Sequence, residues 1–252
     1  MTRRRWIADE VHGDTAALLG EHAAHLVRVL RAEVGQEFDI ATGDEVRRGT
    51  ITTISYDRVE FALGQMLRRK LEPESSEAPT ITLALSIFKF DRMEWAIEKC
   101  TEIGVTRIIP IIARRTDTHL AIAAVKRCER WRRIVRQAAE QSRRPAPPEI
   151  ATPLKLKDLT FDNSLPTPEP IRIVLAESLA ESNEAPGLGE ILRSRPTAKK
   201  IVLAVGPEGG WADGELSWFH EEGWVAASLG ITILRAETAA IVATALAMEA
   251  LR

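Results

Sequence analysis

The chain has little cysteine, no excess of either charge and no long hydrophobic run. Cys100 and Cys128 are its only cysteines, which indicates a reducing compartment and no disulfide framework. A formal net charge of -2 excludes a global basic field, so affinity for a nucleic acid would have to come from local patches. No apolar run reaches the length of a membrane span, and none follows the arginines at 3–5 as in a signal peptide. We therefore expect a cytoplasmic protein that does not enter a membrane.

Motifs for metal binding and for nucleotide hydrolysis are missing as well. The five histidines match no zinc spacing, although His22 and His25 lie close together in the sequence. No GxxxxGK[ST] occurs, which disfavours a phosphate-binding loop of the hydrolase type. We expect no metal site, and surface or packing roles for the histidines.

Residues 1–72 differ in pattern from the rest of the chain. Short β-like runs separated by turn residues predict a small β-barrel or sandwich. These runs lie at 37–41, 50–54 and 59–63. One helical piece, His22–Leu30, places its apolar residues on one face and leaves Arg28 and Arg31 off that face. The two arginines could contact a polyanion, or they could form an ordinary solvated surface.

Residues 73–79 are rich in proline, serine and glutamate and are typical of a linker. From residue 80 to 252, strand and helix patterns alternate, which predicts an α/β domain whose parallel sheet is covered on both faces. The expected strands are 81–88, 107–112, 171–176, 201–205 and 225–229, and the expected helices are 93–103, 123–142, 213–222 and 237–251. The helix 123–142 has a strongly basic face, which is either solvated or a surface for phosphates.

The stretch Lys200–Gly210, KIVLAVGPEGG, is the most informative local pattern. A buried apolar strand ends in a glycine-rich turn, and a helical pattern follows. Open α/β sheets hold ligands at such a point, because glycines let backbone amides approach a ligand that a Cβ would exclude. From this pattern alone, a simple tight turn is an equally good interpretation.

Several stretches in a fixed order carry a more specific signal. They are His25–Arg31 (HLVRVLR), Lys89–Arg92 (KFDR), Glu98–Val105 (EKCTEIGV), Glu140–Ser142 (EQS), the GPEGG turn and Leu229–Ala239 (LGITILRAETA). Together they make the chain resemble the ribosomal RNA small-subunit methyltransferase E family, the 16S rRNA uridine-N3 methyltransferases of the SPOUT superfamily. The chain departs from the family pattern at Arg143, Ala212, Ile231, Thr232 and Ala236. Arg143 stands where a glycine is common, and Ala212 replaces a helix-capping serine, so that Asp213 is expected to cap instead.

The resemblance implies an N-terminal PUA-like β-barrel that grips RNA and a C-terminal SPOUT domain with a parallel sheet, a trefoil knot and a homodimer contact. It also implies S-adenosylmethionine as the cofactor, bound among three loops. Carried over by position, the cofactor-binding residues are Leu175, Val205, Gly206, Pro207, Glu208, Gly209, Gly210, Leu229, Gly230, Ile233, Leu234, Thr238 and Ala239.

Methylation of uracil N3 requires loss of a proton, so an arginine beside the base would stabilise the developing anion. We expect Arg235 in this role, with Glu208 or Glu237 accepting the proton or fixing Arg235. Glu208 could instead only stabilise its loop, and Glu237 could be a favourable charge at the start of a helix. The RNA contacts implied by position or charge are Arg4, Arg28, Arg31, Lys89, Arg92, Arg114 and Arg143.

The expected substrate is 16S rRNA or the small ribosomal subunit. Two alternatives stay open from the sequence. One is a related SPOUT enzyme that methylates a ribose 2′-OH or a tRNA, and the other is a catalytically silent RNA-binding module with the same fold.

Overall fold

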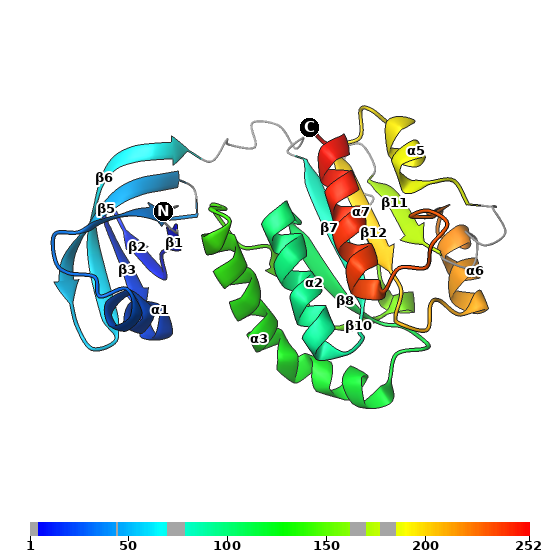
Figure 1. The fold of residues 1–252 in the computed structure, drawn as a ribbon, viewed down its shortest axis with the longest axis horizontal. Coiled ribbons are helices and arrows are strands. Elements are labelled where there is room, and N and C mark those ends of the chain that lie inside the picture. Colours follow the sequence, from blue (N-terminus) through cyan, green and yellow to red (C-terminus); the bar gives the residue numbers. More distant parts are fainter. Residues whose placement is uncertain (1–4, 44, 70–78, 162–169, 177–184) are drawn as a thin grey trace. The chain divides into compact units, whose positions relative to one another are not determined.

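The structure is a computed structural model that describes residues 5–43, 45–69, 79–161, 170–176 and 185–252. It divides into two compact units (Figure 1). Unit 1 comprises residues 1–74 together with 136–147, and unit 2 comprises residues 75–135 together with 148–252. The sequence placed 136–147 in the second domain, whereas their packing groups them with the first. The predicted linker lies outside the described residues except at its last position.

Unit 1 is built on a six-stranded sheet in the order β1-β4-β5-β6-β3-β2. Neighbouring strands are antiparallel except β1 and β4, which are parallel. The strands are β1 (Trp6–Ile7), β2 (Glu10–His12), β3 (Thr15–Leu19), β4 (Glu37–Ala41), β5 (Glu45–Ile54) and β6 (Arg58–Arg69). This agrees with the predicted small β domain, although the sequence pattern did not reveal β1 to β3. Strand pairing among the described residues runs from β1 at one edge of the sheet to β2 at the other edge. Closure of this sheet into a barrel remains a prediction.

The helical piece of unit 1 begins as α1 (Gly20–Ala24) and ends as a π-helical turn, η1 (His25–Val29). Ala23 and Leu26 are buried against the sheet as expected. Leu30, which the sequence placed on the same face, is 49% exposed. A π turn takes more residues per turn than an α turn, so the apolar residues that follow it no longer fall on the buried face.

Residues 136–147 attach to β1 through polar groups. Arg136 donates through Nη1 to Asp9 Oδ1 at 2.7 Å, and the Ile7 amide donates to Glu140 Oε1 at 3.3 Å. Burial alone would raise the pKa of Asp9, but hydrogen bonds from His22 and the Leu19 amide, with the charge of Arg136, hold that pKa below its ordinary value.

Unit 2 contains a parallel seven-stranded sheet in the order β10-β8-β7-β12-β11-β13, with the short β9 also pairing with β8. The strands are β7 (Thr80–Ser86), β8 (Arg107–Ile112), β9 (Glu149–Ile150), β10 (Leu154–Lys155), β11 (Ile171–Leu175), β12 (Lys200–Val205) and β13 (Val225–Ala227). The parallel α/β sheet expected from the sequence is confirmed. Because β12 lies between β7 and β11, the strand before the GPEGG turn is central, and both of its edges are paired.

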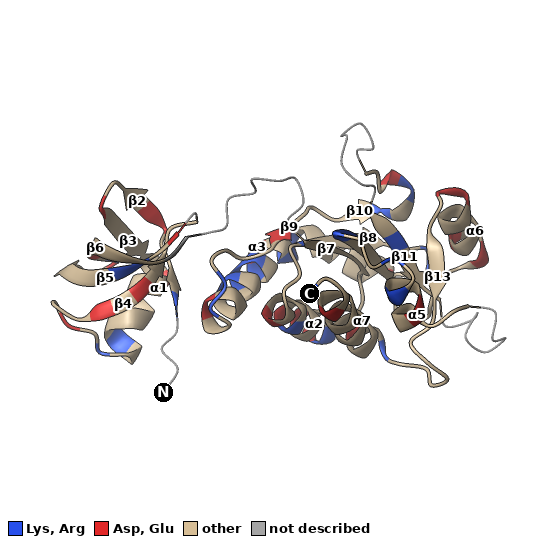
Figure 2. Cartoon of the chain, turned by 90° about the horizontal axis from the view of Figure 1, so that it is seen from above, with Lys and Arg blue, Asp and Glu red and all other residues tan. Residues whose placement is uncertain are grey.

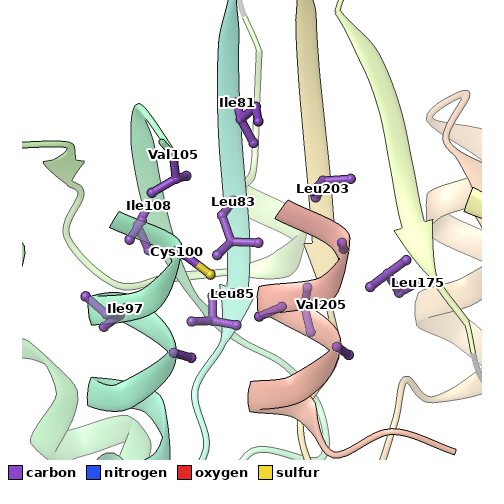
Figure 3. Close-up of a cluster of buried hydrophobic side chains, with 14 of the residues drawn as sticks. Ile81, Leu83, Leu85, Ile97, Cys100, Val105, Ile108, Leu175, Leu203 and Val205 are labelled. Atoms are coloured by element: carbon purple, nitrogen blue, oxygen red, sulfur yellow. The ribbon is translucent and has the colours of Figure 1, made fainter. Parts of the chain in front are cut away.

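Side chains alternate between the two faces of this sheet. Leu83, Leu85 and Leu203 pack on one face beneath the helices, as Figure 3 shows for α2 and α7. Ala84, Ala204 and their neighbours pack on the other face with α6. The helices are α2 (Phe90–Ile103), α3 (Thr118–Gln141), α5 (Leu188–Arg193), α6 (Asp213–Glu221) and α7 (Ala236–Ala250), and the 3-10 turn η2 (Leu156–Asp158) follows β10.

Helix α3 carries the basic residues that the sequence singled out (Figure 2). Several of them are engaged in ion pairs. Arg127 and Arg130 both contact Glu94 of α2, and Arg132 contacts Glu129 one turn away. These pairs neutralise part of the basic face, which favours the solvated interpretation over a phosphate surface.

Both cysteines are buried and free, and burial raises the pKa of Cys100 to about 12. No cluster of metal-ligating side chains occurs among the residues that the structure describes. Within the same residues, no helix has the length and apolarity needed to cross a membrane.

Candidate functional site

A cavity of about 640 Å³ opens at the carboxyl ends of β11, β12 and β13. Its size falls within the usual range for small-molecule sites, roughly 300–1,000 Å³. Three loops surround it: the start of the segment after β11, the turn after β12, and the connection from β13 to α7. The cavity therefore occupies the edge of a parallel sheet at which ligands bind in open α/β folds.

Most residues predicted to bind a cofactor line this cavity. They are Leu175, Val205, Gly206, Pro207, Glu208, Gly209, Gly210, Leu229, Gly230, Ile233, Leu234 and Ala239. Arg235, the predicted catalytic arginine, also lines it. Thr238 and Glu237 do not, because they lie in the first turn of α7 and are partly or fully buried there.

A backbone hydrogen bond and the side chain of Trp211 fix the conformation of the GPEGG turn. The Gly210 amide donates to the Pro207 carbonyl at 2.8 Å, and Gly210 has a φ of 68°, which favours glycine. At Gly206, a Cβ would lie 3.2 Å from Nε1 of Trp211. That indole nitrogen donates to the Leu175 carbonyl at 3.0 Å, so Trp211 ties the end of β11 to the turn after β12.

Helix α6 begins directly after this turn, and its first turn is capped in an unexpected way. The N-cap residue is Ala212, not Asp213 as the sequence suggested. Alanine has no side-chain acceptor, so only the returning half of a capping box forms, in which Glu215 Oε2 accepts from the Ala212 amide at 2.9 Å. Glu215 Oε1 accepts from the Arg114 amide at 2.7 Å, which joins the segment after β8 to α6.

Arg92 reaches from the first turn of α2 to the cavity. Its Nη1 lies 2.7 Å from Glu208 Oε1, and its Nε lies 3.8 Å from Glu237 Oε1. Glu237 is 5% exposed, and its Oε2 has no hydrogen-bond partner among the described residues. Arg92 is thus the cation that links the GPEGG turn to the start of α7. We call these three residues the Arg92 cluster.

The sequence proposed that Glu208 or Glu237 could fix Arg235. In the described side chains both carboxylates pair with Arg92, so a pairing with Arg235 stays a prediction. Arg235 is the N-cap residue of α7 and is exposed, and its guanidinium makes no ion pair within the described parts of the chain. It is free to meet a ligand in the cavity.

The β13–α7 connection contains Ile231 and Thr232, two of the departures named from the sequence, and both line the cavity. Ile231 is 99% exposed and Ile233 is 66% exposed, although both line the cavity. The third departure in this region, Ala236, begins α7 and is buried. The apolar side chains at 231 and 233 lie where an apolar ligand group could cover them.

Sequence reasoning missed several lining residues. Arg115 donates through Nη1 to the Gly209 carbonyl at 2.7 Å, and Trp211 forms part of the wall. The other missed residues are Ala176, Ala227 and Ser228, while Ile231, Thr232 and Ala236 had been named only as departures. One signal was present: Arg115 follows β8, and the carboxyl ends of parallel strands meet at one edge of a sheet.

The described residues among the predicted RNA contacts are distributed over both units. Lys89 is exposed at the N-cap of α2, and Arg114 is exposed after β8. Arg28 and Arg31 belong to unit 1, and Arg28 lies over the ring of Tyr56. Arg4 lies outside the described residues.

Arg143 has a φ of 60°. Glycine adopts this left-handed conformation more readily than arginine does. Its carbonyl accepts a hydrogen bond from Arg5. The side chain of Arg143 is exposed, which is compatible with the predicted RNA contact but does not test it.

Comparison with known proteins agrees with this architecture. The family model described as RNA methyltransferase domain matches residues 75–248. The ribosomal RNA small subunit methyltransferase E of Synechocystis is 35% identical over 231 residues, which cover 92% of this chain and 72% of the relative. The protein of that name from Bacillus subtilis is 29% identical over 237 residues, covering 91% and 88%.

A solved structure is similar over almost the whole length. The ribosomal RNA small subunit methyltransferase E from Neisseria gonorrhoeae, bound to S-adenosyl methionine, superposes with a TM-score of 0.78 at 30% identity. The alignment covers 96% of this chain and 95% of the other.

Proposed function

Because the chain belongs to the ribosomal RNA small subunit methyltransferase E family, we propose that it transfers a methyl group from S-adenosylmethionine to N3 of a uridine in 16S rRNA. The observation that carries this proposal is the cavity at the carboxyl ends of β11 to β13, with its glycine-rich walls. The donor in the Neisseria relative supports the choice of cofactor.

The residues of the cavity fit this donor. Leu229, Ile233 and Leu234 offer apolar walls for an adenine, and the backbone groups of the surrounding loops can recognise its polar edge. Gly206 leaves open the space that a Cβ would take beside Trp211. When bound, S-adenosylmethionine supplies a methyl group that is already electrophilic. The protein therefore needs to hold the donor and the acceptor base in line, which is mainly a positioning effect.

The acceptor nitrogen carries a proton, and the chain must stabilise the anion that forms when this proton leaves. Arg235 is exposed, lines the cavity and has no described ion-pair partner, so its charge is available to a uracil carbonyl oxygen. Glu208 lines the cavity as well and is the better candidate to accept the proton. Glu237 does not line the cavity, which favours a role in holding Arg92.

We expect cations in both units to bind the RNA. We assign residues 1–72 to a PUA-like RNA-binding domain, 73–79 to a linker and 80–252 to a SPOUT domain with a trefoil knot, although residues 136–147 of the latter pack as part of unit 1. The exposed Arg28, Arg31, Lys89, Arg114 and Arg143 would contact phosphates, which position the RNA without reading its sequence. The target base has to leave its stack to reach the cavity.

A homodimer would cover the outer face of α7. Between Glu237 and Glu249 this helix has no charged residue, and Leu246 is 40% exposed. Trp95 of α2, the helix that packs beside α7, is 49% exposed. Light scattering of a Leu246→Glu variant tests this contact: a monomer is expected, and an unchanged dimer would contradict it.

Mass analysis of 16S rRNA from a strain that lacks the protein tests the function. We expect N3-methyluridine to disappear at one position and to return when purified protein and S-adenosylmethionine are added to the subunits. Loss of a ribose methyl group or of a tRNA modification would replace the proposed target with another. If the protein also failed to bind S-adenosylmethionine in calorimetry, it would be a silent RNA-binding module.

A further inference from the structure

Unit 2 has a second hollow that the proposed methyl transfer does not use. It encloses about 410 Å³ and lies at the carboxyl ends of β8 and β10. The end of β8, the η2 turn and the first two turns of α6 form its walls. Since every strand of this sheet is parallel, the hollow and the donor cavity open at the same edge of the sheet.

Consecutive residues separate the two spaces. Arg115 lines the donor cavity, while Arg114, its neighbour in the chain, lines the second hollow. On the other side, Trp211 belongs to the donor cavity and Gly214 to the hollow. The two spaces therefore adjoin each other at two segments of the chain.

The rim of the hollow is basic. Arg114, Lys155 and Lys157 are exposed, and none of these three forms an ion pair within the residues that the structure describes. The one acidic residue of the lining is Glu215, whose two oxygens already accept from backbone amides. Three cations thus face an anionic ligand with little internal neutralisation.

The remaining lining is apolar and includes an aromatic ring. Trp218 is half-buried and packs edge-to-face on Phe219, with ring centroids 5.2 Å apart. This contact fixes the indole from one side, and Trp218 also lines the hollow. A cationic rim around a fixed aromatic ring is the chemistry that binds single-stranded nucleic acid, through phosphates and through base stacking.

We propose that this hollow is a subsite for an unstacked nucleotide of the RNA substrate that flanks the target base, with the base on Trp218 and phosphates on Arg114, Lys155 and Lys157. This assignment rests on the proposed function, because it takes the ligand to be the RNA that is methylated. It extends that function by adding Lys155, Lys157 and Trp218, which lie outside every motif that the sequence singled out.

The test compares two double variants that each remove two cations. Lys155→Ala with Lys157→Ala should weaken binding of 16S rRNA about tenfold at 0.1 M salt, and should reduce the slope of log affinity against log salt by about 1.4, or about 0.7 for each lost phosphate contact. Arg193→Ala with Arg195→Ala removes two exposed cations elsewhere in unit 2 and should change little. In calorimetry, both double variants should bind S-adenosylmethionine with the same affinity as the protein without substitutions. Equal losses of RNA affinity in the two double variants, or no loss in either, would overturn the subsite.

A second pair of variants tests the ring. Trp218→Leu should weaken RNA binding about tenfold, because one base loses the ring on which it stacks, and Trp218→Phe should recover most of the affinity. Equal affinities of both variants would reject stacking. Uridine monophosphate binding as tightly as RNA would assign the hollow to a free nucleotide instead. A protein that bound RNA through these residues but methylated no uridine would refute the proposed function and leave the subsite standing.

Discussion

Replacing Arg92 with alanine separates two roles for this residue. The sequence predicts an RNA contact, whereas the structure places its guanidinium between Glu208 and Glu237. In the second role, the variant loses the link between the GPEGG turn and the start of α7. Both the stability of unit 2 and the affinity for the methyl donor should then fall.

The magnitude follows from the exposure of each partner. The pair with Glu208 has side chains that are 33% and 38% exposed, so solvent limits its contribution to about 0.5 kcal/mol. The side chain of Glu237 is 7% exposed, and losing its cation leaves a buried carboxylate unpaired. Such losses reach about 3–5 kcal/mol for close pairs, and we expect about 2 kcal/mol at this separation of 3.8 Å. The sum of about 2–3 kcal/mol corresponds to a decrease in Tm of about 5–10 °C for a protein of this size.

Thermal unfolding and calorimetry with S-adenosylmethionine measure the two effects. For Arg92→Ala we expect the lower Tm and a threefold to tenfold weaker donor affinity, about 0.7–1.4 kcal/mol. Lys89→Ala is the matched control, because Lys89 is an exposed cation at the start of the same helix and has no ion pair in the described structure. It should weaken RNA binding and leave Tm unchanged. If Arg92→Ala behaved like Lys89→Ala in all three measurements, the Arg92 cluster would have no structural role.

Three further predictions concern single positions. Gly206→Ala should weaken donor binding several-fold in calorimetry, because the new Cβ displaces the Trp211 indole; an unchanged affinity would mean that the ring yields freely. Arg31→Gly should raise Tm by about 2–4 °C, because the φ of 52° at Arg31 costs about 1 kcal/mol that glycine does not incur. The same variant should bind RNA more weakly, and a lower Tm would contradict the proposed backbone strain. Asp9→Asn should lower the free energy of unfolding by about 1–2 kcal/mol at pH 7 but not near pH 2 in denaturant titrations. The lowered folded-state pKa of Asp9 means that its contribution is present above the unfolded pKa and is lost as pH falls through the folded value, so an equal loss at both pH values would refute this assignment.

The sequence predicted the parts of the fold that depend on local pattern. The apolar run before GPEGG became β12, the predicted helix 213–222 became α6, and the alanine-rich segment became α7. These elements are long or strongly periodic, and a glycine follows β12 and α6. Two-residue and three-residue strands such as β1 and β2 contain too few positions to show a period, so no local pattern could reveal them.

The candidate site was predictable where it follows a motif and unpredictable where it depends on packing. The GPEGG turn and the residues after β13 line the cavity as expected. Arg92 and Arg115 come from segments about 100 residues away, and only the tertiary arrangement determines which carboxylate or carbonyl each one meets. Of the proposed subsite around Trp218, the sequence indicated only Arg114, because the lining residues come from three separate segments.

The pairing of β12 with β7 also has a consequence for how the chain reaches its folded state. Lys200 lies opposite Thr80, so 120 positions separate two strands at the centre of the sheet. Contacts this distant in sequence form late, because a long loop has to close before any hydrogen bond between the strands compensates for the lost entropy. During synthesis, β7 keeps an apolar edge unpaired until residue 200 has emerged, and this edge is open to wrong partners. Refolding should therefore be slow, with yields that decrease as protein concentration increases.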